Sequence, residues 1–118
     1  DPDDIEAIAA FAFVEMLESG YSSVAEFHSV PHQPGGTPYS SLGELSERIA
    51  AAASASGIGL TLLPVAYAQG GVDGRALAGG QLRFGNDVER FSKQAQAAEK
   101  AARQTGPDAG FGIAPHSI

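Results

Sequence analysis

The sequence predicts an α/β fold in which three consecutive helix–strand units contribute parallel strands to one sheet. Segments with helical spacing alternate with short apolar segments, in the order helix, strand, helix, strand, helix, strand. Glycines able to end helices, Gly20, Gly57 and Gly106, recur at intervals of about 40 residues, the length of a βα unit with generous loops. Because right-handed crossovers make such strands parallel, the repeat fits a doubly wound sheet or part of a (β/α)8 barrel.

Size, charge and cysteine content limit the classes of protein to which the chain can belong. Its 118 residues suit one domain with a modest core. Seven basic against 14 acidic residues give a formal charge of −7 without any basic run, so nucleic acid and anionic membranes are not expected as partners. The lack of cysteine excludes disulfides and thiolate metal sites and is compatible with the cytoplasm. The start at Asp1, without Met or signal peptide, predicts an internal fragment.

The first unit is a predicted helix over residues 1–19 and a strand over 21–28. Asp1 can cap the helix, and Gly20 can end it in the left-handed conformation. The apolar face is wider than a solvent-facing helix needs, so we expect the helix to lie between the sheet and its neighbours. This face comprises Ile5, Ile8, Ala9, Phe11, Ala12, Phe13, Val14, Met16 and Leu17.

The second unit is a predicted helix over 42–56 and a strand over 58–66. Ser41 and Glu44 form the S-x-x-E pattern of a capping box, in which each side chain satisfies the other residue's free backbone N–H. The strand is apolar throughout, which is typical of a strand buried on both faces of a parallel sheet. Pro64 removes a hydrogen-bond donor, so we expect it near the strand end or at a bulge.

The third unit follows a long glycine-rich loop over 67–80 and consists of a helix over 86–104 and a strand over 109–115. Loops of this length are often functional. Asn86, with Glu89 three residues later, predicts the cap of the helix. The predicted inward-facing residues of this helix are Val88, Phe91, Ala95 and Ala98.

Each predicted strand leads into a side chain that can bind a ligand or take part in a reaction: His28, Tyr67 and His116. Since α/β proteins place their chemistry at the carboxyl ends of parallel strands, these are the first candidates for a site. A lone histidine there is more often structural than a ligand. His28 and His32 have H-x-x-x-H spacing but need not converge, so we expect no metal site from them. Glu26 is either a barrel-interior carboxylate or a charge that protects a sheet edge.

Four segments occur in an order and at a spacing that resemble one known family. They are residues 24–39, 57–65 and 83–91 and the pair His116-Ser117. Together they are similar to formimidoylglutamate deiminases of the amidohydrolase superfamily. The resemblance covers nearly the whole chain and implies a partial (β/α)8 TIM barrel of the amidohydrolase type, with these strands as strands two, three and four.

The resemblance also implies a function. It implies a zinc-dependent hydrolase of histidine degradation that converts N-formimino-L-glutamate to N-formyl-L-glutamate and ammonia in the cytoplasm. The implied partners are this small-molecule substrate and, as a candidate assembly, a second copy in a homodimer. In the family pattern the metal ligands and catalytic residues lie outside this segment, so the isolated chain is expected to be inactive.

Two positions match substrate-binding residues of the family. His116 matches a histidine in an H-S-L-R motif, in which this chain has Ile118 in place of Leu. Ser29 stands where the family's F-H-Y-x-H-H motif has tyrosine, and Pro31 replaces the first histidine of the pair. Because a serine hydroxyl reaches less far than a phenol, a direct contact would become water-mediated or vanish. His28 is a further substrate-binding candidate.

Two other functions stay open on the sequence. Since Ser29 breaks the motif linked to specificity, one is another amidohydrolase-type deaminase, similar to guanine deaminase. The other is a self-contained α/β module whose loops, 29–39 and 67–80, take a small anion or a protein partner.

Overall fold

The computed structural model describes residues 1–117 and consists of three helix–strand units. Its elements are, in chain order, α1 (Pro2–Glu18), β1 (Ser23–His28), α2 (Glu44–Ser56), β2 (Gly59–Tyr67), the short 3-10 helix η1 (Gly79–Phe84), α3 (Val88–Thr105), β3 (Gly110–Phe111) and β4 (Ala114–Ser117). Strand β2 pairs in parallel with β1, β3 and β4. The predicted fold class, helix–strand units with parallel strands, is therefore confirmed. Within these residues no helix has the length and apolarity needed to cross a membrane.

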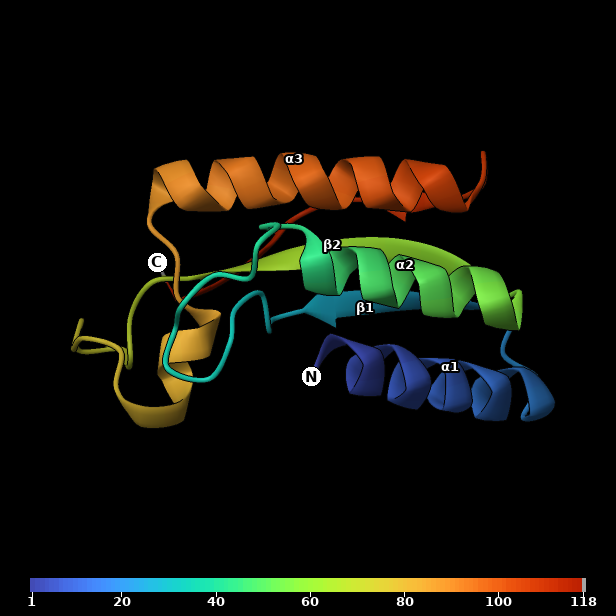
Figure 1. The fold of residues 1–118 in the computed structure, drawn as a ribbon, viewed down its shortest axis with the longest axis horizontal. Coiled ribbons are helices and arrows are strands. Elements are labelled where there is room, and N and C mark those ends of the chain that lie inside the picture. Colours follow the sequence, from blue (N-terminus) through green and yellow to red (C-terminus); the bar gives the residue numbers. More distant parts are fainter. Residues whose placement is uncertain (118) are drawn as a thin grey trace.

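The three helices cover one face of the sheet and run antiparallel to its strands (Figure 1). The register pairs Val24 with Leu60 and Glu26 with Leu62, so these four side chains share a face. Leu60 and Leu62 lie in the buried core, to which the helices contribute Phe13, Ile49, Ala50, Ala52, Ala53, Ala98, Ala101 and Ala102. The opposite face carries Phe27, which is 64% exposed, and no helix of residues 1–117 covers it.

Helix α1 is capped as predicted but is less covered than predicted. The Asp1 carboxylate accepts the backbone N–H of Asp4 at 3.0 Å. Phe13 is only 3% exposed and enters the core. Within residues 1–117, however, α1 packs against α2 and the sheet along one side only. The remainder of its apolar face is therefore exposed, namely Ile8, Phe11 and Val14.

The predicted caps of α2 and α3 are wrong. The Ser41 hydroxyl accepts the N–H of Gly43 at 3.2 Å within the loop, so Gly43 precedes α2 and the Ser41 capping box does not form. At α3 the Asp87 carboxylate accepts the N–H of Arg90 at 2.7 Å. Asn86 is buried and engaged in tertiary contacts. In both cases a competing hydrogen bond removes the predicted cap from its role.

The inner face of helix α3 matches the predicted one only in part. Val88 is 88% exposed, and Phe91 and Ala95 are half-buried. The fully buried residues, which are Gln94, Ala98, Ala101 and Ala102, include only one of the predicted set. Small side chains let α3 lie close to α2 and the sheet, and a polar residue, Gln94, faces inward because it has a buried partner.

The third strand is interrupted instead of continuous over 109–115. Strand β3 pairs with β2 up to Leu62, and β4 resumes the pairing beyond Pro64. The N–H of Gly112 donates to the Leu62 carbonyl at 3.1 Å, so the backbone groups of Leu62 point toward the third strand. Residues two apart on a strand direct their backbone groups to the same side, so the backbone of Pro64 also faces the third strand. Since Pro64 has no N–H, the ladder lacks a donor where the pairing stops. Pro64 thus lies inside β2, and the irregularity falls in its neighbour.

Candidate functional site

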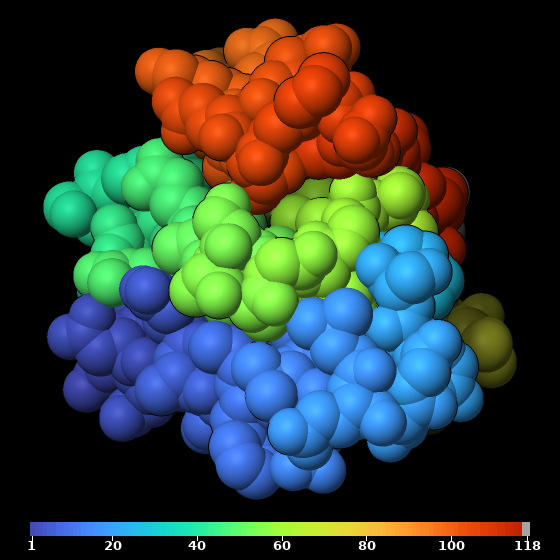
Figure 2. Space-filling view, turned by 90° about the vertical axis from the view of Figure 1, so that its right-hand side faces the viewer, coloured from blue at the N-terminus to red at the C-terminus, as the bar shows by residue number. Residues whose placement is uncertain are grey.

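The carboxyl ends of the strands gather at one end of the molecule. The loops over residues 29–43 and 68–87 lie at this end, together with the end of β4 (Figure 1). Figure 2 looks onto the opposite end, where the three units follow each other in chain order across the molecule. The parallel register therefore brings three chemically capable residues to a single edge, namely His28, Tyr67 and His116.

His28, the last residue of β1, is buried at this edge. It pairs in register with Pro64 and shares the helix-covered face with Leu62. Its side chain is 4% exposed, and its Nε2 atom has no hydrogen-bond partner within residues 1–117. Burial disfavours the charged ring and lowers the pKa of His28 to about 4. His28 is therefore uncharged at neutral pH. Ser29, the next residue, is only half-buried, whereas His28 is buried.

His116 presents the most exposed of the three side chains and stacks on Tyr67. The two ring centroids are 4.4 Å apart and the ring planes differ by 15°. The Tyr67 ring also contacts Phe84 of η1, with centroids 5.5 Å apart and an interplanar angle of 57°. The ends of β2 and β4 and the loop containing η1 thus meet in an aromatic cluster made of Tyr67, Phe84 and His116.

Three buried polar residues fasten the loops behind this edge. The Nε2 atom of His32 lies 2.8 Å from Oδ1 of Asn86. The Asn86 amide donates to Oε1 of Gln94 in α3. The backbone N–H of Asn86 donates to the carbonyl of Tyr67 at 3.0 Å. We call His32, Asn86 and Gln94 the buried network; it ties the loop after β1, the end of β2 and helix α3 to one another.

The sequence pattern does not predict this network. It indicates His32 only as half of a metal-binding pair and Asn86 only as a helix cap. The available signal was Gln94, a polar residue four positions before Ala98 on the inner side of α3. A buried amide needs a partner, but the partner's identity depends on a loop more than fifty residues away.

Glu26 lies on the helix-covered face and not on the bare one. Its register partner is Leu62, a core residue. Burial raises the pKa of the Glu26 carboxyl, and within residues 1–117 it forms no ion pair. The interior of a (β/α)8 barrel is the face opposite the helices, so the expectation of a barrel-interior carboxylate is wrong. The other expectation is a charge at a sheet edge, and β1 does lie at an edge of the described sheet.

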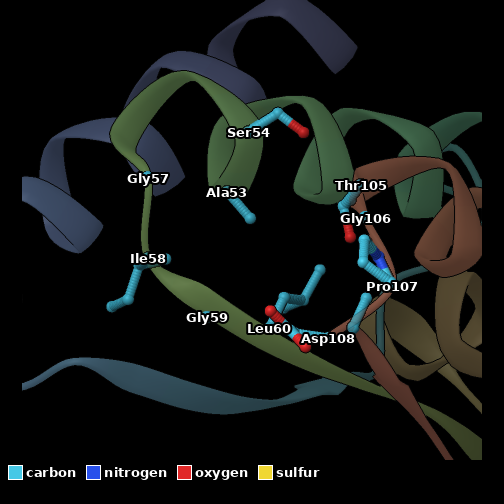
Figure 3. A pocket seen from close by; sticks show the side chains of 11 residues that line it. Ala53, Ser54, Gly57, Ile58, Gly59, Leu60, Thr105, Gly106, Pro107 and Asp108 are labelled. Atoms are coloured by element: carbon cyan, nitrogen blue, oxygen red, sulfur yellow. The ribbon is translucent and has the colours of Figure 1, made fainter.

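Two hollows lie at opposite ends of the molecule. The first has a volume of about 280 Å³ and lies between the end of α2, the start of β2 and the segment after α3 (Figure 3). It contains Ser54, Thr105 and Asp108 but none of the strand-end residues. The second has a volume of about 490 Å³ and lies at the carboxyl edge, with Gly36, Leu82 and Asn86 in its wall. Only the second adjoins the loops that carry the candidate site.

The described residues do not form a metal centre. No group of three or more His, Cys, Asp or Glu side chains within residues 1–117 is placed to hold an ion. His32 already directs Nε2 to Asn86 and Gly85. Within residues 1–117, His116, Tyr67 and the adjoining loops can contribute hydrogen bonding and stacking at this edge.

Comparison with known proteins finds similar chains among curated proteins and solved structures. No family model matches. The chain is 45% identical over 117 residues to formimidoylglutamate deiminase from Pseudomonas aeruginosa, covering 99% of this chain and 25% of that protein. The crystal structure of an amidohydrolase from Brucella melitensis matches with a TM-score of 0.93 and 46% identity, covering 98% of this chain and 26% of that one. The chain thus spans about a quarter of each protein, and its fold is that of the corresponding part of the amidohydrolase.

Proposed function

We propose that this chain is a segment of an amidohydrolase-type enzyme that hydrolyses a C–N bond, and that its reaction is the deimination of N-formimino-L-glutamate to N-formyl-L-glutamate and ammonia. The observation that supports this most is the 45% identity to a formimidoylglutamate deiminase, which extends over 99% of the chain. A match of this length includes the loops at the carboxyl edge as well as the core. The associated pathway, histidine degradation, and a cytoplasmic location form part of the same proposal.

The proposed enzyme uses zinc, but this segment does not supply the ligands. Within residues 1–117 the metal-ligating residue types form no cluster of three. The zinc ligands and the groups that move protons would therefore come from other parts of the barrel. We assign to this chain only the binding and positioning of the substrate.

His116 is the proposed substrate-binding residue. Its imidazole is exposed at the carboxyl edge, and stacking leaves the ring nitrogens open around the ring edge. Such a group can donate to a substrate carboxylate or accept from a formimino N–H. His28 is buried and uncharged at neutral pH, so its position supports a structural role beneath the edge more than a direct contact.

Ser29 is the proposed site of altered substrate contact. It follows His28 at the end of β1 and is half-buried. A tyrosine at this position would extend several ångströms further than the serine hydroxyl. The substitution favours weaker binding of formiminoglutamate and supports a second candidate reaction, the deamination of another substrate such as guanine.

A segment exchange tests the proposed function. The part of the Pseudomonas aeruginosa deiminase that aligns with this chain is replaced by this chain, and the zinc-loaded chimera is assayed for ammonia release from formiminoglutamate and from guanine. We expect turnover of formiminoglutamate with a KM higher than that of the parent enzyme, which is the positive control. A folded, metal-loaded chimera that turns over neither substrate, with Ser29 or with Ser29→Tyr, would overturn the proposal. Turnover of guanine alone would establish the second candidate.

A further inference from the structure

We propose that Tyr67 is a positioning residue that holds the imidazole plane of His116 for the substrate. This inference rests on the proposed function, because it assigns to His116 a contact with the substrate. It adds a residue, Tyr67, that does not itself touch the substrate in this scheme.

The backbone of β4 aims the His116 side chain toward Tyr67. Pro115 pairs with Ala66 and Ser117 pairs with Tyr67, so the register shifts by one residue and His116 has no partner of its own in β2. An extra residue of this kind bends a strand and redirects a side chain, and such irregularities are frequent beside active sites. Here the redirected ring lies face to face with Tyr67 at a centroid distance of 4.4 Å.

Tyr67 is itself fixed from two directions. Its carbonyl accepts the N–H of Asn86 at 3.0 Å, and the Asn86 side chain is held by the buried network. Its ring packs against Phe84 at a centroid distance of 5.5 Å. Tyr67 is half-buried whereas His116 is exposed, so the tyrosine is the fixed partner of the stack and the histidine is the group that it restrains.

The stack has a direct consequence for recognition. Both imidazole nitrogens lie in the plane of the ring, so a contact across the ring face fixes the plane in which they donate or accept while leaving them free. Within residues 1–117 the aromatic contact of the His116 ring is this stack. An unrestrained histidine would lose rotamer freedom on binding, which weakens affinity, whereas a restrained one has already lost it. We therefore expect the loss of the Tyr67 ring to raise KM and to leave kcat nearly unchanged.

The kinetic test uses the zinc-loaded chimera described above. Tyr67→Leu keeps apolar bulk but removes the ring face, Tyr67→Phe keeps the ring, and Tyr21→Leu is a matched control at an exposed tyrosine before β1. Relative to the unsubstituted chimera, we expect Tyr67→Leu to raise KM for formiminoglutamate about 5-fold to 10-fold, with kcat within 2-fold. The other two variants should stay within about 2-fold of the unsubstituted chimera in both constants. In a His116→Ala background, Tyr67→Leu should have no further effect on KM. An equal effect of Tyr67→Leu with and without His116, or a failure of Phe to preserve KM, overturns the proposal.

A second readout separates this inference from the proposed function. The histidine ring signals are recorded by NMR in the 13C-histidine-labelled full chain and in the labelled chimera, without substrate. Stacking on Tyr67 should shift the His116 ring protons upfield, with the shift retained in Tyr67→Phe and lost in Tyr67→Leu. If the chimera has no deiminase activity but this pattern holds, the proposed function fails and the positioning stands. If the His116 signals are the same in the unsubstituted protein, Tyr67→Phe and Tyr67→Leu, the positioning role of Tyr67 is wrong whatever the activity.

Discussion

The Nε2 atom of His32 lies 2.8 Å from the side-chain oxygen of Asn86, which is 54 positions further along the chain. The same nitrogen lies 3.1 Å from the carbonyl oxygen of Gly85. Because both neighbours are hydrogen-bond acceptors, Nε2 donates, and Nδ1 is buried without a partner in residues 1–117. One buried histidine thus fastens the loop after β1 to the loop after β2, beside the proposed substrate edge.

The buried network predicts that replacing Gln94 destabilises the protein much more than replacing Gln96, another glutamine of α3. Gln94 is 0% exposed and accepts from the Asn86 amide, whereas Gln96 is exposed. Gln94→Ala leaves the Asn86 amide unpaired in the interior and should lower the free energy of unfolding by about 2–3 kcal/mol. Gln96→Ala should change it by less than about 0.5 kcal/mol. Urea unfolding of the full chain measures both values, and equal values would contradict the network's role.

The adjacent glycines of the loop after β1 allow backbone strain and steric clash to be separated. Gly35 and Gly36 have φ angles of 91° and 89°. A Cβ at Gly35 meets nothing within 4 Å, but at Gly36 it would lie 2.7 Å from the carbonyl oxygen of Leu82. Gly35→Ala should therefore lower the free energy of unfolding by about 1 kcal/mol through backbone strain alone. Gly36→Ala should lower it by about 2–3 kcal/mol, because the two loops must also separate. Thermal and urea unfolding would show identical costs if the loops did not pack at this point.

Acid should destabilise the chain through His28. The folded-state pKa of His28 is about 4, below its ordinary 6.5, so the unfolded state binds more protons between these values. The resulting stability is complete above about pH 6.5 and is lost as the pH falls toward 4. From pH 7 to pH 4.5 the free energy of unfolding should fall by about 2–3 kcal/mol more in the native chain than in His28→Asn.

Comparing the two proteins across pH isolates the His28 contribution. Burial raises the pKa of Glu26, so protonation of this carboxyl stabilises the folded state as the pH falls, which is the opposite sign. Because Glu26 is present in both proteins, its effect cancels in the difference between their urea-unfolding curves. Parallel pH profiles for the native chain and His28→Asn would show that His28 does not titrate with a lowered pKa.

Restoring a tyrosine at position 29 should strengthen substrate binding. In the zinc-loaded chimera, Ser29→Tyr should lower KM for formiminoglutamate about 10-fold with little change in kcat, the effect of one regained hydrogen bond to a charged group. Ser22→Tyr, at the residue before β1, is the control and should leave KM unchanged. Steady-state kinetics decide the outcome, and a KM that is unaffected or raised by Ser29→Tyr would show that position 29 does not contact the substrate.

Local chemistry explains what could be predicted from the sequence. The alternation of helical and extended segments, the parallel sheet and the Asp1 cap depend on residues that are neighbours in the chain or on the near-invariant hand of crossover connections. Gly57 likewise ends α2 in the left-handed conformation as predicted, with a φ of 84°. The arrival of His28, Tyr67 and His116 at one edge follows from the same rules, because parallel strands of successive units end on the same side.

Tertiary contacts decided the rest. Asn86 is a good helix cap by type, but a buried histidine and a buried glutamine engage its side chain, and Asp87 caps α3 instead. The interruption of the third strand depends on Pro64 in the neighbouring strand, and the stack of His116 on Tyr67 depends on a one-residue register shift between β2 and β4. Local sequence patterns do not contain such pairings, because their energies arise only when distant segments meet and satisfy each other's polar groups. The sequence alone therefore determined the order and direction of the elements, and the folded arrangement determined which side chains face one another.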